Sequence, residues 1–74
     1  MWRRTWYVLA RGGRWAVRRE RALHPDSIHD TKEDAIARGL DLAERAQGRL
    51  RIKGLSGRLE EERLFTREKP SNRD

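Results

Sequence analysis

Apolar and polar residues alternate along the start of the chain in the pattern of a β-hairpin. Residues 5–11 and 14–20 are rich in aromatic and β-branched side chains, and Gly12 and Gly13 separate them. A Gly-Gly pair supplies the positive φ that both central positions of a type I′ turn require. The expected cross-strand pairs are Arg11–Arg14, Ala10–Trp15, Val8–Val17 and Trp6–Arg19. Opposite residues share a face, so one apolar face contains Trp6, Val8, Ala10, Trp15 and Val17.

A helical spacing of apolar residues follows further along the chain. The Thr31 hydroxyl can accept from the backbone N–H of Asp34, which predicts a helix start. Gly39 costs roughly 1 kcal/mol relative to alanine inside a helix, and we expect it to permit close approach to the sheet beneath Trp15. Gly48 is expected to cap the helix end. The apolar stripe consists of Ala35, Ile36, Gly39, Leu40, Leu42, Ala43 and Ala46.

Three further segments complete the predicted plan. Residues 21–30 contain Pro25 and several other turn formers, with a short extended segment at 27–29 that turns Ile28 inward. Residues 49–53 alternate strictly and predict a strand with Leu50 and Ile52 inward. Residues 54–57 form a turn. Residues 58–65 are assigned to a strand because of that turn, although their composition also has helical propensity.

These elements predict an α+β fold in ββαββ order, with an antiparallel sheet of three or four strands packed on one helix. We divide the chain into a basic arm at residues 1–4, a single domain at 5–66 and a polar disordered tail at 67–74. The expected core consists of Trp6, Val8, Trp15, Val17, Ile36, Leu40, Ala43, Leu50, Ile52 and Leu59.

Several of these short motifs resemble a known family. Gly13-Arg14-Trp15-Ala16-Val17, Asp30-Thr31 with Ala35, Ala43, and Gly57-Arg58 are similar to the pattern of DUF2188, a small prokaryotic and phage domain of unknown function. The resemblance covers about residues 6–65. It implies a ββαββ fold and no activity.

The composition argues against catalysis and membrane insertion. The chain of 74 residues contains no cysteine and no apolar run long enough to span a membrane. A small catalytic or metal-binding cluster could be formed by Asp26, His29 and Asp30. We favour the interpretation that these residues shape a turn and cap the helix. We therefore expect no enzyme, catalytic residue, metal, cofactor or small-molecule substrate, and a cytoplasmic location in a bacterial cell or a phage-infected host.

Positive charge is concentrated at the N-terminus. Residues 1–24 contain seven arginines against one acid, so the whole formal excess of +6 lies there. A two-stranded ribbon fits the DNA major groove, where arginine pairs with guanine or neutralises phosphate. We expect nucleic-acid binding through the first hairpin, with DNA favoured over RNA. The expected contacts are Arg3, Arg4, Arg11, Arg14, Arg18, Arg19 and Arg21.

The alternative function is a protein-interaction or self-associating module with no nucleic-acid role. The second face of the first hairpin is more apolar than a solvated face requires, and small sheets with free edges pair with other strands. A host protein or a second copy of the chain would be the partner, and a homodimer is compatible with DNA binding. The expected contact residues are Trp2, Tyr7, Leu9 and Ala16.

Overall fold

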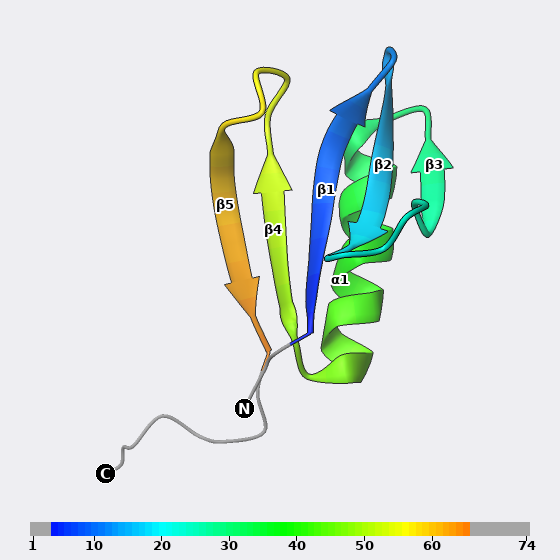
Figure 1. Cartoon of the computed structure of the whole chain (residues 1–74). Helices are drawn as coiled ribbons and strands as arrows, with labels where there is room; N and C mark the ends of the chain where they lie inside the picture. Colours follow the sequence, from blue (N-terminus) through cyan, green and yellow to red (C-terminus); the bar gives the residue numbers. More distant parts are fainter. Residues whose placement is uncertain (1–3, 66–74) are drawn as a thin grey trace, which may run out of the picture.

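A single five-stranded sheet backed by one helix forms the described part of the chain (Figure 1). The computed structural model describes residues 4–65, so the tail at 67–74 and most of the arm at 1–4 lie outside the described residues. The elements are β1 (Thr5–Arg11), β2 (Arg14–Arg19), β3 (Ser27–His29), α1 (Lys32–Ala46), β4 (Arg49–Lys53) and β5 (Leu59–Leu64).

The first hairpin has the predicted register. Each of the four expected pairs is present, from Arg11–Arg14 at the turn to Trp6–Arg19 at the open end. Gly12 and Gly13 both have positive φ, at 55° and 82°, as a type I′ turn requires. Residues 59–64 form a strand, which confirms the choice of strand over helix.

The predicted antiparallel sheet is wrong, because the sheet is mixed and has five strands. Its order is β3-β2-β1-β4-β5, and β1 pairs with β4 in parallel. The short strand β3 pairs with β2 and reverses the chain once more before α1. The helix then returns the chain to the end of the sheet where β1 begins, so β4 enters in the same direction as β1. The element order is therefore βββαββ, and β1 becomes the central strand.

The core lies between α1 and the sheet. Its fully buried large side chains are Val8, Val17 and Leu50. Gly39 permits the close helix–sheet contact, because a Cβ there would lie 2.7 Å from Leu50 Cδ1. The neighbours of Gly39 are thus Leu50 and Val8, whereas the sequence suggested Trp15. The buried core cluster contains Trp6, Val8, Val17, Ala35, Ala43, Leu50 and Ile52, with Trp15, Ile36, Leu40, Leu42, Ala46 and Phe65 packed against it.

The predicted core residue Leu59 and the residue expected to turn inward at the short extended segment, Ile28, lie on the other side of the sheet. Leu59 is 40% exposed, because a register shift beside Lys53 places it opposite that residue, on the sheet face away from α1. Ile28 is exposed as well, because it pairs with Ala16 on the same outer face. In both cases the strand pairing decided which face received the side chain.

The helix ends differ in how well they were predicted. Thr31 caps the start as expected, with Asp34 N–H donating to its hydroxyl at 3.1 Å. At the other end Gln47, not Gly48, adopts the left-handed conformation, with φ 53°. Gly48 instead lies against the Arg4 backbone, where a Cβ would overlap the Arg4 carbonyl oxygen.

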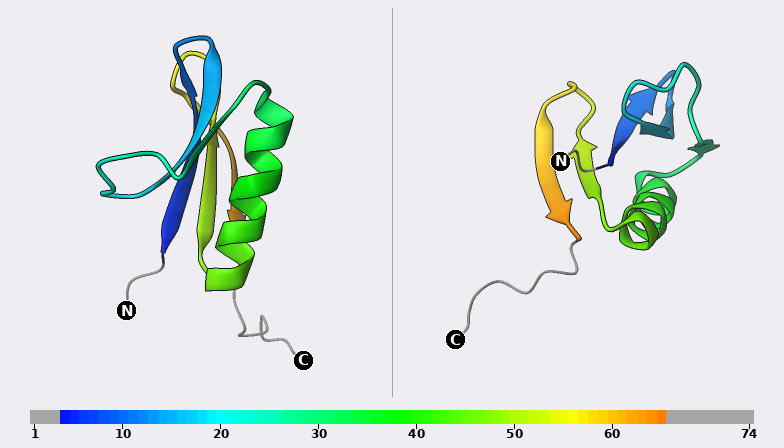
Figure 2. Two further views of the ribbon diagram at one scale, coloured as in Figure 1. Left: turned by 90° about the vertical axis from the view of Figure 1, so that its right-hand side faces the viewer. Right: turned by 60° about the horizontal axis from the view of Figure 1, so that its bottom comes forward.

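The molecule has two layers, with α1 on one side of the sheet only (Figure 2, left). The connection between β2 and β3 projects from the opposite side. Within residues 4–65, no helix is long and apolar enough to cross a membrane.

Candidate nucleic-acid interface

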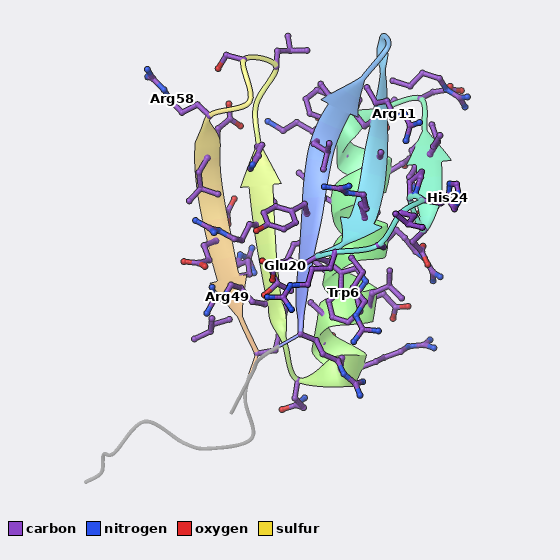
Figure 3. The ribbon with its side chains drawn as sticks, in the orientation of Figure 1. Trp6, Arg11, Glu20, His24, Arg49 and Arg58 are labelled. Atoms are coloured by element: carbon purple, nitrogen blue, oxygen red, sulfur yellow. The ribbon has the colours of Figure 1, made fainter. Side chains whose placement is uncertain are left out.

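The sheet surface opposite α1 carries a cluster of basic side chains around one tyrosine. We call this surface the open face. Because β1 is the central strand, Tyr7 occupies the middle of it, directly opposite Arg18 of β2 and Arg51 of β4. Figure 3 views this face, with Arg49 low on β4 and Arg11 and Arg58 towards the two hairpin turns. Around Tyr7 the open face contains Leu9, Arg18, Arg49, Arg51, Lys53, Leu59, Glu62 and Leu64.

Two cations of β4 lie over the tyrosine ring. Lys53 Nζ is 5.0 Å from the ring centroid of Tyr7, and Arg51 Cζ is 6.0 Å from it. Both distances allow a cation–π interaction. The ring therefore holds positive charge near the centre of the open face.

Three arginines of the open face have unsatisfied hydrogen-bonding capacity. The Nε atoms of Arg18, Arg49 and Arg51 are buried and have no hydrogen-bond partner. Arg49 Nε and Arg51 Nε lie 3.3 and 3.7 Å from the same oxygen of Glu62, so one carboxylate serves two guanidinium groups. Because these Nε atoms are enclosed by protein, an anionic ligand would reach the arginines through the exposed remainder of each side chain, which is 36% exposed in Arg49 and 34% in Arg51.

A shallow hollow of about 290 Å³ lies beside the tyrosine. Tyr7 and Leu9 of β1 form part of its lining, and the projecting β2–β3 connection contributes further lining residues. This volume is near the lower end of the roughly 300–1,000 Å³ typical of ligand pockets. The complete lining is Tyr7, Leu9, Arg18, Glu20, Arg21 and Lys53.

The arginines expected to bind nucleic acid are spread over several surfaces. Arg14 Nε pairs with Asp30 at 2.9 Å, and Arg19 lies over the ring of Trp6, at 5.7 Å from its centroid. Arg11 and Arg4 are exposed, and Arg3 lies outside the described residues. Of the expected set, the structure brings only Arg18 and Arg21 to the hollow.

The residues predicted to contact a partner protein also do not form one exposed surface within the described part of the chain. Ala16 is 1% exposed, because it lies between Leu9 and Ile28 on neighbouring strands, and so it offers no contact surface. Tyr7 and Leu9 are half-buried within the basic surroundings of the hollow. Trp2 lies outside the described residues.

Sequence reasoning missed the basic side chains of β4. These side chains are Arg49, Arg51 and Lys53, and they belong to the part of the chain whose formal charge sums to zero. A count of charge along the sequence therefore does not single them out. Their alternation with Leu50 and Ile52 did place them on the face away from the helix. Only the parallel pairing of β4 with β1 puts them next to Tyr7.

The structure brings no metal-binding constellation together within residues 4–65. His29 Nε2 lies 2.8 Å from the Ser27 hydroxyl, within hydrogen-bond distance, and His24 is exposed on the β2–β3 connection. Asp26 and Asp30 instead form ion pairs with Arg38 and Arg14.

Comparisons with known proteins give a family but no relative of known activity. The model of DUF2188, described as an uncharacterized protein conserved in bacteria, matches residues 6–65. No curated protein and no solved structure matches the chain.

Proposed function

We propose that this chain, which belongs to the DUF2188 family of uncharacterized proteins conserved in bacteria, binds nucleic acid through the open face of its sheet. The observation that carries the proposal is the cluster of four cations around Tyr7 on the open face, which Glu62 balances only in part; the cations are Arg18, Arg49, Arg51 and Lys53. A phosphate backbone supplies closely spaced anionic oxygens, and arginine binds phosphate with short, charge-assisted hydrogen bonds.

The charge balance of this surface supports a polyanion over a single carboxylate. Glu62 already lies near Arg49 and Arg51, and it leaves their Nε atoms unsatisfied. Lys53 and Arg18 add two further cations on either side of Tyr7. The proposed interface therefore combines the first hairpin with β4. Its centre lies at Tyr7 on the open face and not at the turn of the first hairpin.

Salt dependence tests this proposal. Contact with three or four phosphates of a single strand gives a slope of about −2 to −3 in a plot of log affinity against log salt. Affinity should then fall about 20- to 50-fold between roughly 50 and 200 mM salt. Fluorescence anisotropy with labelled DNA, as a single strand and as a duplex, measures this slope.

The variant that tests the surface is the triple substitution Arg18→Gln, Arg51→Gln and Lys53→Gln. It should remove most of the salt-dependent binding. The matched control is Arg38→Gln, Arg45→Gln and Arg63→Gln, which changes the net charge equally. The control side chains pair with acids on α1, on the β2–β3 connection or on the α1 side of β5. Equal losses in both variants would show a nonspecific charge effect and contradict the proposal.

A second candidate function is self-association along β5. All six residues of this edge strand are exposed, and its outer backbone groups have no neighbouring strand in the described chain. Antiparallel pairing of two copies centred on Glu62 would place Glu61 of each copy opposite Arg63 of the other, on the α1 side of the sheet. The substitution Arg63→Glu would turn that ion pair into a repulsion. Light scattering over a range of concentrations should detect a dimer that this substitution dissociates and that Glu61→Arg with Arg63→Glu restores.

A further inference from the structure

The hollow on the open face lies beside an aromatic ring, which bears on the form of nucleic acid that can bind. Tyr7 is the one aromatic side chain that the described residues place on this face, because Trp6 and Trp15 point towards α1. It is half-buried on the central strand, so its position is fixed by strands on both sides. A rigidly held ring in the middle of a basic surface is a stacking platform for a base.

We propose that the open face takes single-stranded nucleic acid, with one unpaired base in the hollow against Tyr7; this inference rests on the proposed function. In a duplex the flat faces of each base are covered by its neighbours, so an interior base cannot stack on a protein ring without leaving the helix. An unpaired base has a free face. Tyr7 can therefore contribute to binding a single strand but not to binding an intact duplex.

The side chains around the hollow match the parts of a nucleotide. Tyr7 and Leu9 provide apolar contact for the base, and the cations Arg18, Arg21 and Lys53 lie around it for the phosphates. Lys53 Nζ now lies over the ring at 5.0 Å, and a base that enters takes its place. The displaced ammonium remains next to the hollow, where it meets the phosphate of the same nucleotide.

The size of the hollow limits what it holds. About 290 Å³ suits one nucleotide, and the β2–β3 connection projects on the same side of the sheet (Figure 2, left). Glu20, on the β2–β3 connection, also lines the hollow, and its carboxylate accepts hydrogen bonds. It therefore favours a base edge with an N–H donor and disfavours a phosphate at that point. The hollow thus takes one base, and the phosphates lie against Arg18, Arg21 and Lys53.

The test compares three labelled DNA probes of equal length with the full chain: a thymidine strand, a strand of abasic residues and a duplex. The thymidine strand should bind about 5- to 150-fold more tightly than the abasic strand, which corresponds to about 1–3 kcal/mol of stacking on one base. The substitution Tyr7→Leu should abolish this difference between the thymidine and abasic strands. The conservative Tyr7→Phe keeps the ring and should keep the difference.

The outcomes separate this inference from the function on which it rests. If the thymidine and abasic strands bind equally well to the unaltered protein, or if the duplex binds more tightly than both, the stacking site is wrong while nucleic-acid binding stands. If no probe binds at low salt, the proposed function itself fails. The comparison between thymidine and abasic strands needs no variant, so it decides the question even if Tyr7→Leu does not fold.

Discussion

Replacing Gly48 with alanine should strongly destabilise the fold. Gly48 is buried at the junction of α1 and β4, and an added Cβ would overlap the carbonyl oxygen of Arg4 and lie 3.1 Å from its carbonyl carbon. That carbonyl cannot withdraw freely, because it accepts from Arg49 N–H at 2.7 Å. Gly48 is held on its other side too, since its own carbonyl accepts from Phe65 N–H at 2.8 Å.

The magnitude follows from the hydrogen bonds that must yield. Leaving a buried backbone group unsatisfied costs about 1–3 kcal/mol, and the overlap places two such bonds at risk. Alanine recovers about 0.4–1 kcal/mol by restricting the unfolded chain. The net loss should be about 2–4 kcal/mol, which lowers the Tm of a domain this small by roughly 10–30 °C. Urea unfolding followed by the fluorescence of Trp6 and Trp15 measures it.

Gly54→Ala is the matched control. Gly54 is also buried, but a Cβ there meets only the carboxylate end of Glu60, a flexible and exposed side chain. Glu60 can swing away at the cost of its ion pair with Lys32, and exposed ion pairs contribute about 0–1 kcal/mol. Equal losses at Gly48 and Gly54, or a loss below about 1 kcal/mol at Gly48, would refute the argument from backbone contact.

Three further predictions concern other parts of the fold. Gln47→Gly should stabilise the protein by about 1 kcal/mol in urea unfolding, because the left-handed conformation costs a side-chain-bearing residue about 1–2 kcal/mol and the exposed Gln47–Glu44 hydrogen bond returns part of that. Trp6→Ala should cost roughly 3–5 kcal/mol, and more than Trp15→Ala, because Trp6 is 7% exposed whereas Trp15 is half-buried; equal losses would contradict this. Glu62→Gln should steepen the salt dependence of single-strand binding by about 0.7 in slope, because it frees an arginine for one more phosphate; an unchanged slope would contradict this.

Local patterns predicted the elements well because they depend on nearby residues. The Gly12-Gly13 turn set the register of the first hairpin, and the Thr31 hydroxyl set the start of α1. Both features need only a few consecutive residues, so they can be read from sequence. Strict alternation in residues 49–53 likewise gave the correct faces of β4.

Pairing between distant strands could not be predicted in the same way. The direction in which β4 enters the sheet depends on β3, because this strand reverses the chain once before α1. The three residues of β3 form a strand by pairing with β2, a contact that the local sequence does not specify. The parallel pairing of β4 with β1 carries Arg51 and Lys53 to Tyr7, so the candidate site was missed together with the topology. The charge count gave equal weight to Arg18, which lies on the open face opposite Tyr7, and to Arg14, which is paired with Asp30.

The place of β1 in the centre of the sheet has a consequence for the order of folding. On one edge β1 pairs with β2, which follows it directly in the chain. On its other edge β1 pairs with β4 (Arg49–Lys53), whose residues lie more than forty positions after their partners. Contacts of such long sequence separation are slow to form. On the ribosome, the first hairpin therefore emerges with one side of its central strand unpaired until α1 and β4 have followed. Gly48 lies where β4 begins beside Arg4, so the folding rate should respond to changes there.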